Sequence, residues 1–143
     1  MPRTPPPDRA GFPAFVDLQT RWNDNDEYGH LNNATYLELF DTAMSYWQIE
    51  NGITIRGPDA WRFVVVESGC TYFREVGFPD RLAAGLRVAR LGGSSFRIEI
   101  GLFRAGEDEA ASLGFFVNVL TGADGRPTPI PDDLRARLSR IAV

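Results

Sequence analysis

One short stretch, residues 21–36, holds a dense set of side chains that could do acid–base chemistry. It reads Arg-Trp-Asn-Asp-Asn-Asp-Glu-Tyr-Gly-His-Leu-Asn-Asn-Ala-Thr-Tyr, and it contains three carboxylates and the only histidine of the chain. The pattern before it is typical of a strand, and the pattern after it is typical of a helix. We therefore expect its side chains to converge on one loop between two rigid elements, where proteins often carry catalytic groups.

Asp26 is the candidate acid or base of this loop. The helix start that follows it offers unpaired backbone N–H groups and a partial positive charge, which could polarise a carbonyl while Asp26 activates water. His30 lies four residues further on and could fix the loop or hydrogen-bond the reacting groups. Aspartate and asparagine are also common caps and turn formers. The residues alone leave both interpretations open.

Other chemistries fit these residues poorly. Asp24, Asp26 and Gly29 match positions 1, 3 and 6 of a calcium-binding EF-hand loop, but Thr35 stands at position 12, where an acid is required. A single histidine with nearby carboxylates follows no spacing rule for a transition metal. No Gly-x-Ser-x-Gly motif marks a serine nucleophile. Cys70 lies in a strand pattern and not at a helix N-terminus that would lower its pKa, so we expect no metal and no thiolate chemistry.

Length and composition limit the classes of protein. A chain of 143 residues suits one domain, and a net charge of −4 argues against a nucleic-acid partner. The lone cysteine fits a reducing compartment, no apolar run approaches the ~20 residues that span a bilayer, and the start lacks the apolar core of a signal peptide. We expect a cytoplasmic protein with no membrane partner. Residues 1–12 are interpreted as a flexible proline-rich lead-in, and residues 13–143 as a single domain.

Hydrophobic periodicity predicts an α+β fold. Residues 15–22 alternate like a half-buried strand, and a helix with a broad apolar face should begin after Asn32 or Asn33 and end near Glu50. Four further strand patterns follow in residues 61–75, 82–88, 96–102 and 111–119. A two-residue turn is expected at Gly92-Gly93, and a short helix after Pro131. The predicted order β-α-β-β-β-β, with the last four strands in an antiparallel meander, describes a curved five-stranded sheet around one long helix, which is the hot-dog fold.

The loop motif also resembles that of a known family. Residues 21–36 are similar to the opening motif of the hot-dog acyl thioesterases, both the 4-hydroxybenzoyl-CoA thioesterase-like family and the acyl-carrier-protein thioesterases. Phe78-Pro-Asp80 resembles that family's Tyr-Gly-Asp turn, and residues 91–96 resemble its next hairpin. The resemblance runs from about Phe15 to Leu120.

The resemblance implies roles for individual residues. Asp26 matches the catalytic aspartate, and His30 matches the histidine of the carrier-protein branch. Asp24 and Arg21 look like loop-fixing residues. Tyr28 stands where plant-type enzymes have a functional asparagine, which is a departure from the pattern. The residues expected to contact the substrate are Tyr28, Gly29, Asn32, Asn33, Tyr36, Glu67, Arg90, Ser94, Ser95 and Arg97.

Glu67 interrupts a strand face that it is expected to share with Phe63, Val65, Thr71 and Phe73. A buried acid is costly unless it is paired. Either this end of the strand is wet, or Glu67 assists at the site.

The hairpin residues Arg90, Ser94, Ser95 and Arg97 are the candidates for binding nucleotide phosphates. The related bacterial aryl-CoA enzyme has basic residues where this chain has Gly92-Gly93, so phosphate binding through those positions is lost or shifted. Solvated strand positions are the alternative interpretation of Arg90 and Arg97.

The implied substrate is a coenzyme A or acyl-carrier thioester, with no further cofactor, bound where two subunits of a homodimer or a dimer of dimers meet. Two alternatives stay open. One is a hot-dog protein that binds an acyl thioester without hydrolysing it, and the other is a hydratase or dehydratase on the same fold. Tyr36, Tyr46 and Trp47 could line an acyl tunnel or belong to the core.

Overall fold

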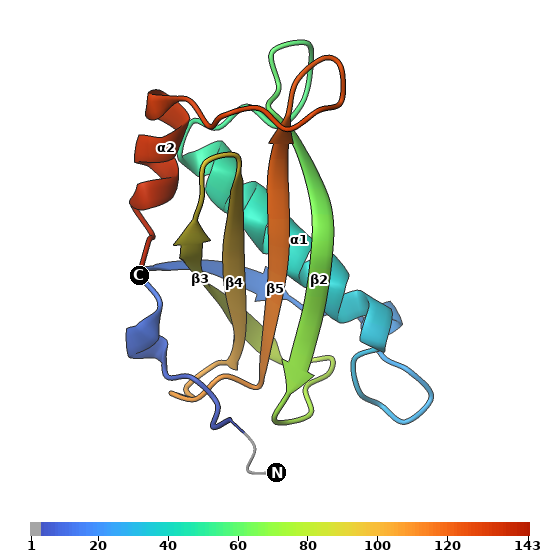
Figure 1. The fold of residues 1–143 in the computed structure, drawn as a ribbon. Coiled ribbons are helices and arrows are strands. Elements are labelled where there is room, and N and C mark those ends of the chain that lie inside the picture. Colours follow the sequence, from blue (N-terminus) through green and yellow to red (C-terminus); the bar gives the residue numbers. More distant parts are fainter. Residues whose placement is uncertain (1–3) are drawn as a thin grey trace.

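The computed structural model describes residues 4–143 and contains one antiparallel sheet with a long helix across one face (Figure 1). No helix in this described part of the chain combines the length and the apolar character needed to cross a membrane. Short 3-10 turns form at Arg9–Gly11 and Trp22–Asp24. The strands and helices are β1 (Ala14–Gln19), α1 (Asn33–Glu50), β2 (Arg62–Tyr72), β3 (Arg81–Leu91), β4 (Ser95–Arg104), β5 (Ser112–Thr121) and α2 (Asp132–Ser139).

The sheet has the strand order β1-β3-β4-β5-β2, which confirms the predicted hot-dog architecture. Only β3, β4 and β5 form a meander, so the predicted four-stranded meander is wrong for β2. This strand does not pair with β3, which follows it in the chain, but with β5, with Phe63 opposite Leu120. The connection between β2 and β3, residues 73–80, is longer than a tight hairpin turn and packs against the loop that joins β1 to α1. Two strands that follow each other in the chain therefore do not pair with each other here.

Helix α1 begins and ends as its sequence predicts. The side chain of Asn32 accepts a hydrogen bond from the Ala34 N–H and caps the first turn. Gly52 adopts a φ of +71° just past the last turn, a conformation that favours glycine. Leu37 is exposed, because the buried face of the helix includes Leu39 in its place. The apolar core residues of the helix are Tyr36, Leu39, Phe40, Ala43, Met44 and Trp47.

Strands β3 and β4 direct their predicted apolar rows, from Leu82 to Val88 and from Phe96 to Leu102, against the helix. Strand β5 is turned by one residue relative to the prediction. Its core positions alternate from Ser112 to Leu120, and the predicted row from Leu113 to Val119 is half-buried on the outer face of the sheet. Gly114 explains this register, because the ring of Phe40 fills the space that a Cβ at Gly114 would take.

The stretch expected as a flexible lead-in lies partly outside the described residues, but from Pro7 onward it is attached to the sheet. The Ala110 N–H donates to the Pro7 carbonyl oxygen at 2.9 Å. Phe12 is buried against Phe103 in an edge-to-face contact. The Arg9 guanidinium donates to the backbone carbonyls of Arg104, the last residue of β4, and of Glu107 in the β4–β5 connection. The packed unit therefore extends ahead of residue 13.

Candidate functional site

The loop that joins β1 to α1 is fixed at its start by an ion pair. Asp24 is buried, and its carboxylate accepts the Arg21 backbone N–H at 2.8 Å and the Arg21 guanidinium at 2.8 Å. Burial alone would raise the pKa of Asp24, but the hydrogen bonds and charge of Arg21 outweigh it and lower that pKa. The tight 3-10 turn turns Trp22 out to solvent, so the strand ends at Gln19 and not at residue 22 as predicted.

Residues 26–30 fold into a turn around the Asp26 carboxylate. The Asp26 N–H donates to the His30 carbonyl oxygen at 2.7 Å. One carboxylate oxygen of Asp26, Oδ1, accepts the backbone N–H groups of Tyr28 (2.9 Å) and His30 (3.2 Å). Gly29 has a φ of +82°, which explains why a glycine occupies this position. Two backbone donors thus fix the orientation of the Asp26 side chain.

A pocket of about 660 Å³ opens beside this turn, and both Asp26 and His30 line it. Asn33 and Tyr36 contribute from the first turn of α1, so the start of the helix borders the same pocket as the carboxylate. The remaining lining residues are Tyr28, Leu31, Tyr72, Phe73, Arg74 and Glu75. The structure therefore brings together the predicted residues Asp26, Tyr28, His30, Asn33 and Tyr36.

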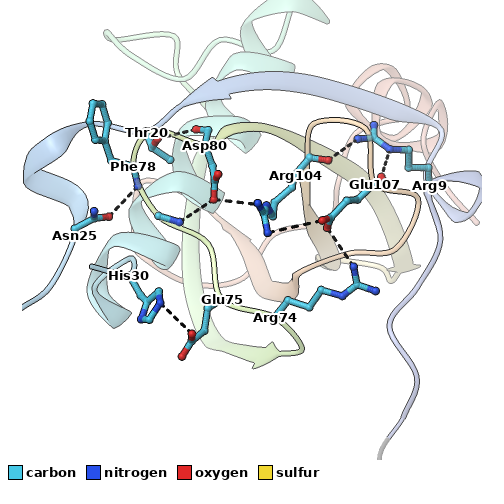
Figure 2. A network of polar contacts seen from close by, with 11 residues as sticks. Arg9, Thr20, Asn25, His30, Arg74, Glu75, Phe78, Asp80, Arg104 and Glu107 are labelled. Carbon is cyan, nitrogen blue, oxygen red and sulfur yellow. Dashed lines mark hydrogen bonds and ion pairs between the residues drawn. The ribbon is translucent and has the colours of Figure 1, made fainter. Parts of the chain in front are cut away.

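The second wall of the pocket comes from residues 73–80, which we call the buttress segment. The Leu31 N–H donates to the Val76 carbonyl oxygen at 2.8 Å, and Asn25 Oδ1 accepts the Phe78 N–H at 2.9 Å (Figure 2). A Cβ at Gly77 would lie only 2.7 Å from the Gly29 carbonyl oxygen. The two backbones therefore pack directly on each other.

The buttress segment is in turn attached to the sheet (Figure 2). Its last residue, Asp80, pairs with Arg104 on β4 at 3.6 Å, and its carbonyl oxygen accepts the Thr20 hydroxyl at 2.6 Å. Near its start, Arg74 pairs with Glu107 at 3.2 Å. Ion pairs and hydrogen bonds at both ends therefore hold the wall in place.

One acid at the pocket was missed by the sequence interpretation. Glu75 Oε2 lies 3.0 Å from His30 Nε2, so the two walls also meet through their side chains. These residues are 45 positions apart, and no spacing rule connects them. The only sequence signal is an acid at the last position of the predicted strand pattern 61–75, and acids at strand ends are common on surfaces.

Tyr36 and Tyr72 line the pocket, and the Cys70 thiol lies close to both of them. The rings of Tyr36 and Tyr72 meet edge to face at 4.9 Å. Burial raises the pKa of Tyr36 to about 12 and that of the Cys70 thiol to about 11. These groups are neutral near pH 7, and a thiol in this state is a poor nucleophile.

The hairpin residues predicted to bind phosphate do not reach this pocket within the chain. The β3–β4 hairpin and α2 lie at the end of the sheet opposite the loop that joins β1 to α1 (Figure 1). Arg97 pairs with Glu99 at 3.4 Å and its guanidinium lies 3.8 Å from the ring centre of Phe115. The Gly92 N–H donates to the Ser95 carbonyl oxygen, so the turn centres on Gly93 and Ser94, one residue later than predicted. Arg90, Ser94, Ser95 and Arg97 are therefore separate from Asp26 and His30.

Glu67 also lies away from the pocket. The pairing of β2 with β5 shifts between Val65 and Glu67, where a β-bulge forms. After this shift Glu67 stands opposite Val117 on the outer face of the sheet, whereas Phe63 packs into the core. The predicted shared face of Glu67 and Phe63 is wrong, because one extra residue exchanges the two faces of a strand.

A second cavity, of about 860 Å³, lies between β1 and α1 and is lined by charges of both signs, such as Asp17, Arg21, Glu38 and Arg81. Neither Asp26 nor His30 lines it. Tyr46 does, whereas Trp47 is buried in the core, so these two neighbours line no common channel. Within residues 4–143, no group of three or more His, Cys, Asp or Glu side chains is arranged to hold a metal ion.

The sheet wrapped around α1 and the loop ahead of the helix define a hot-dog protein with a polar site at the helix start. Residues 20–138 match the model of the thioesterase-like superfamily, and the chain belongs to this superfamily. None of the curated proteins matches the chain.

Several solved structures are similar over nearly the whole chain. The PA5185 protein from Pseudomonas aeruginosa is 45% identical, with 96% of this chain and 97% of that chain covered and a TM-score of 0.90. A thioesterase from Thermus thermophilus, complexed with coenzyme A and zinc, is 33% identical, with 92% and 95% covered and a TM-score of 0.74. A 1,4-dihydroxy-2-naphthoyl-CoA thioesterase from Synechocystis is 15% identical, covers 87% and 93%, has a TM-score of 0.79, and shows the shared fold alone.

Proposed function

We propose that this thioester hydrolase acts on an acyl-CoA and that Asp26 is its general base or nucleophile. The observation that carries this proposal is the Asp26 carboxylate, held by two backbone N–H groups at a pocket shared with His30 and the start of α1. The coenzyme A in the related Thermus thermophilus thioesterase supports a coenzyme A thioester over a carrier-protein thioester.

Two routes give the same products from this geometry. As a base, Asp26 takes a proton from water while the water oxygen attacks the thioester carbon, and the C–S bond then breaks. As a nucleophile, the carboxylate attacks that carbon, the thiolate leaves, and water hydrolyses the resulting mixed anhydride. In both routes the thiolate takes up a proton, and the products are an acid and a thiol. Backbone N–H groups at the start of α1 would stabilise the developing oxyanion, and His30 would orient Asp26 or the thioester.

We also propose that the site is completed by a second subunit. Strand β2 forms an edge of the sheet, and Val64, Val65 and Val66 in its first half are exposed. An exposed apolar edge strand is a template for pairing with another strand. Because Tyr72 at the end of β2 lines the pocket, a partner paired along this edge would lie next to it. A cytoplasmic location remains a prediction from composition.

The proposed acyl group is compact. The Tyr36–Tyr72 ring pair adjoins the pocket, and the fully buried Phe40 ring occupies the space above Gly114. The region between α1 and β5 is therefore packed with side chains in place of a channel for a long chain. An aryl or short aliphatic acyl group suits this environment better than a fatty acyl chain.

The test is the Asp26→Asn variant, assayed for thiol release from aryl-, short-chain and long-chain acyl-CoAs. Loss of a general base typically lowers the rate by about 10²–10⁴-fold, and we expect a loss of that size with an unchanged circular dichroism spectrum. Among the wild-type substrates, aryl and short-chain thioesters should be hydrolysed fastest. Full activity of Asp26→Asn would overturn the assignment, and tight binding of acyl-CoA without thiol release by the wild type would identify a binding protein instead.

A further inference from the structure

We infer that Glu75 is a positioning residue for His30, a role that rests on the proposed thioester hydrolysis. Glu75 Oε2 and His30 Nε2 are 3.0 Å apart, and both residues line the Asp26 pocket (Figure 2). They come from its two different walls, the turn around Asp26 and the buttress segment. The contact therefore connects the wall that carries Asp26 to the wall that does not.

The chemistry of the contact determines the protonation pattern of the ring. An ionised carboxylate only accepts hydrogen bonds, so His30 Nε2 must carry the proton at this contact. In the neutral ring the lone pair is then on Nδ1, because the two ring nitrogens exchange roles. Glu75 thus selects which nitrogen of the only histidine in the chain can act as an acceptor.

The backbone places Glu75 where this selection can occur. Next to the contact, the Leu31 N–H donates to the Val76 carbonyl oxygen at 2.8 Å, so residues 30–31 and 75–76 run side by side. At the other end of the His30 residue, its own N–H donates to Asp26 Oδ1. His30 is therefore held by Asp26 through its backbone and by Glu75 through its ring.

The other charged group of the wall does not compete for Glu75. Arg74 also lines the pocket, but its guanidinium pairs with Glu107 at 3.2 Å and with Glu109 at 3.3 Å. The Arg74 charge is thus engaged on the side of the β4–β5 connection, and the Glu75 carboxylate is directed to His30.

A purely structural role predicts a different result from a positioning role. The side chains of His30 and Glu75 are 43% and 73% exposed, and ion pairs in such settings contribute little to stability. Removal of the Glu75 carboxylate should therefore leave the thermal midpoint almost unchanged. A marked loss of turnover with unchanged stability would come from the ring, and not from the fold.

The test uses Glu75→Ala and Glu75→Gln with Glu27→Ala as the matched control, since Glu27 is an exposed acid in the loop that carries His30 and lies outside the pocket lining. Carboxylates that orient a metal-bound histidine contribute about 10–100-fold to affinity or activity, and for this metal-free ring we expect an effect at the lower end of that range. We expect Glu75→Ala to lower kcat about 10-fold with KM within about twofold. Glu75→Gln, which keeps an acceptor oxygen, should retain more activity than Glu75→Ala, and Glu27→Ala should match the wild type.

A double variant and the tautomer of the His30 ring test whether Glu75 acts through His30. In a His30→Gln background, Glu75→Ala should cause no additional loss, because the two residues act as one unit. Nitrogen chemical shifts of the single imidazole should show the Nε2–H tautomer in the wild type and a mixture in Glu75→Ala. An unchanged tautomer, or an equal loss of kcat with and without His30, overturns the inference. If the wild type itself releases no thiol, the proposed function fails separately, and the tautomer still decides whether Glu75 positions the ring.

Discussion

At the scale of single residues, the loop ahead of α1 shows how two aspartates with similar sequence surroundings take different roles. Asp24 is buried and paired with Arg21, so its charge is used to hold the loop. Asp26 is only partly buried, accepts backbone N–H groups on one oxygen and lines the pocket. Asp24 borders the other cavity, between β1 and α1, but it is almost fully buried and its charge is paired with Arg21, whereas Asp26 lines the pocket that His30 also lines. This difference supports Asp26 as the reacting group.

The ion pair of Asp24 leads to a prediction about acid stability. Because its pKa is lowered from 3.8 in the folded protein, its contribution is fully present above the unfolded value and is lost as the pH falls through the lower folded value. Asp24→Asn should lower the free energy of unfolding near pH 7 by about 1–2 kcal/mol, and the deficit should shrink below about pH 4. Urea unfolding at several pH values measures this, with exposed Asp41→Asn as the control. A deficit that does not change with pH would contradict the assignment of the charge.

At the scale of elements, the site depends on contact between two loops that lie far apart in the sequence. Gly77 allows this contact, because it has no side chain to separate the buttress segment from Gly29 and His30. The loop around Asp26 is local and could be predicted from spacing. Its partner wall could not, since the wall depends on β2 pairing with β5 and on hydrogen bonds between residues far apart in the chain.

Gly77→Ala tests this contact. Its Cβ would lie 2.7 Å from the Gly29 carbonyl oxygen and 3.3 Å from the His30 Cα, so one of the two backbones must move. Overpacking of this kind costs about 1–3 kcal/mol, and we expect the loss of kcat/KM to exceed what that loss of stability explains. Gly93→Ala is the matched control, because no atom lies within 4 Å of the Cβ it would add. Wild-type turnover in Gly77→Ala would show that the close packing is not required for activity.

The same scale shows which parts of the fold follow from sequence. The boundaries of α1 were readable because Asn32 caps it and Gly52 ends it, which are local effects. The sequence did not indicate which side of β5 faces the core, since both sides carry apolar residues. The orientation depends on the Phe40 ring packing against Gly114. The side of the sheet on which Glu67 lies was mispredicted for a related reason. A β-bulge of one residue has no distinct signature in a run of valines.

At the scale of the whole molecule, the open edge at β2 predicts assembly. Charged residues, especially lysine, are what edge strands use to prevent pairing. We expect the wild type to be a dimer in light scattering and the double variant Val64→Lys/Val66→Lys to be a monomer at the same concentrations. Because the pocket lies at the end of the same strand, activity should fall together with dimer content. The double variant Val64→Thr/Val66→Thr, which keeps strand propensity, is the control. A monomeric wild type with full activity would contradict the proposed shared site.

The Arg9 side chain gives the N-terminal arm an influence at a distance. It donates to the carbonyl oxygens of Arg104 and Glu107 (Figure 2), and the side chains of these same two residues grip the two ends of the buttress segment. Arg9 lines no part of the Asp26 pocket, but it thus supports the two residues that hold the buttress segment. Proteolytic removal of the chain as far as Phe12 would leave every lining residue of the Asp26 pocket in the protein. It would nevertheless weaken the contacts that hold the buttress segment, which carries Glu75.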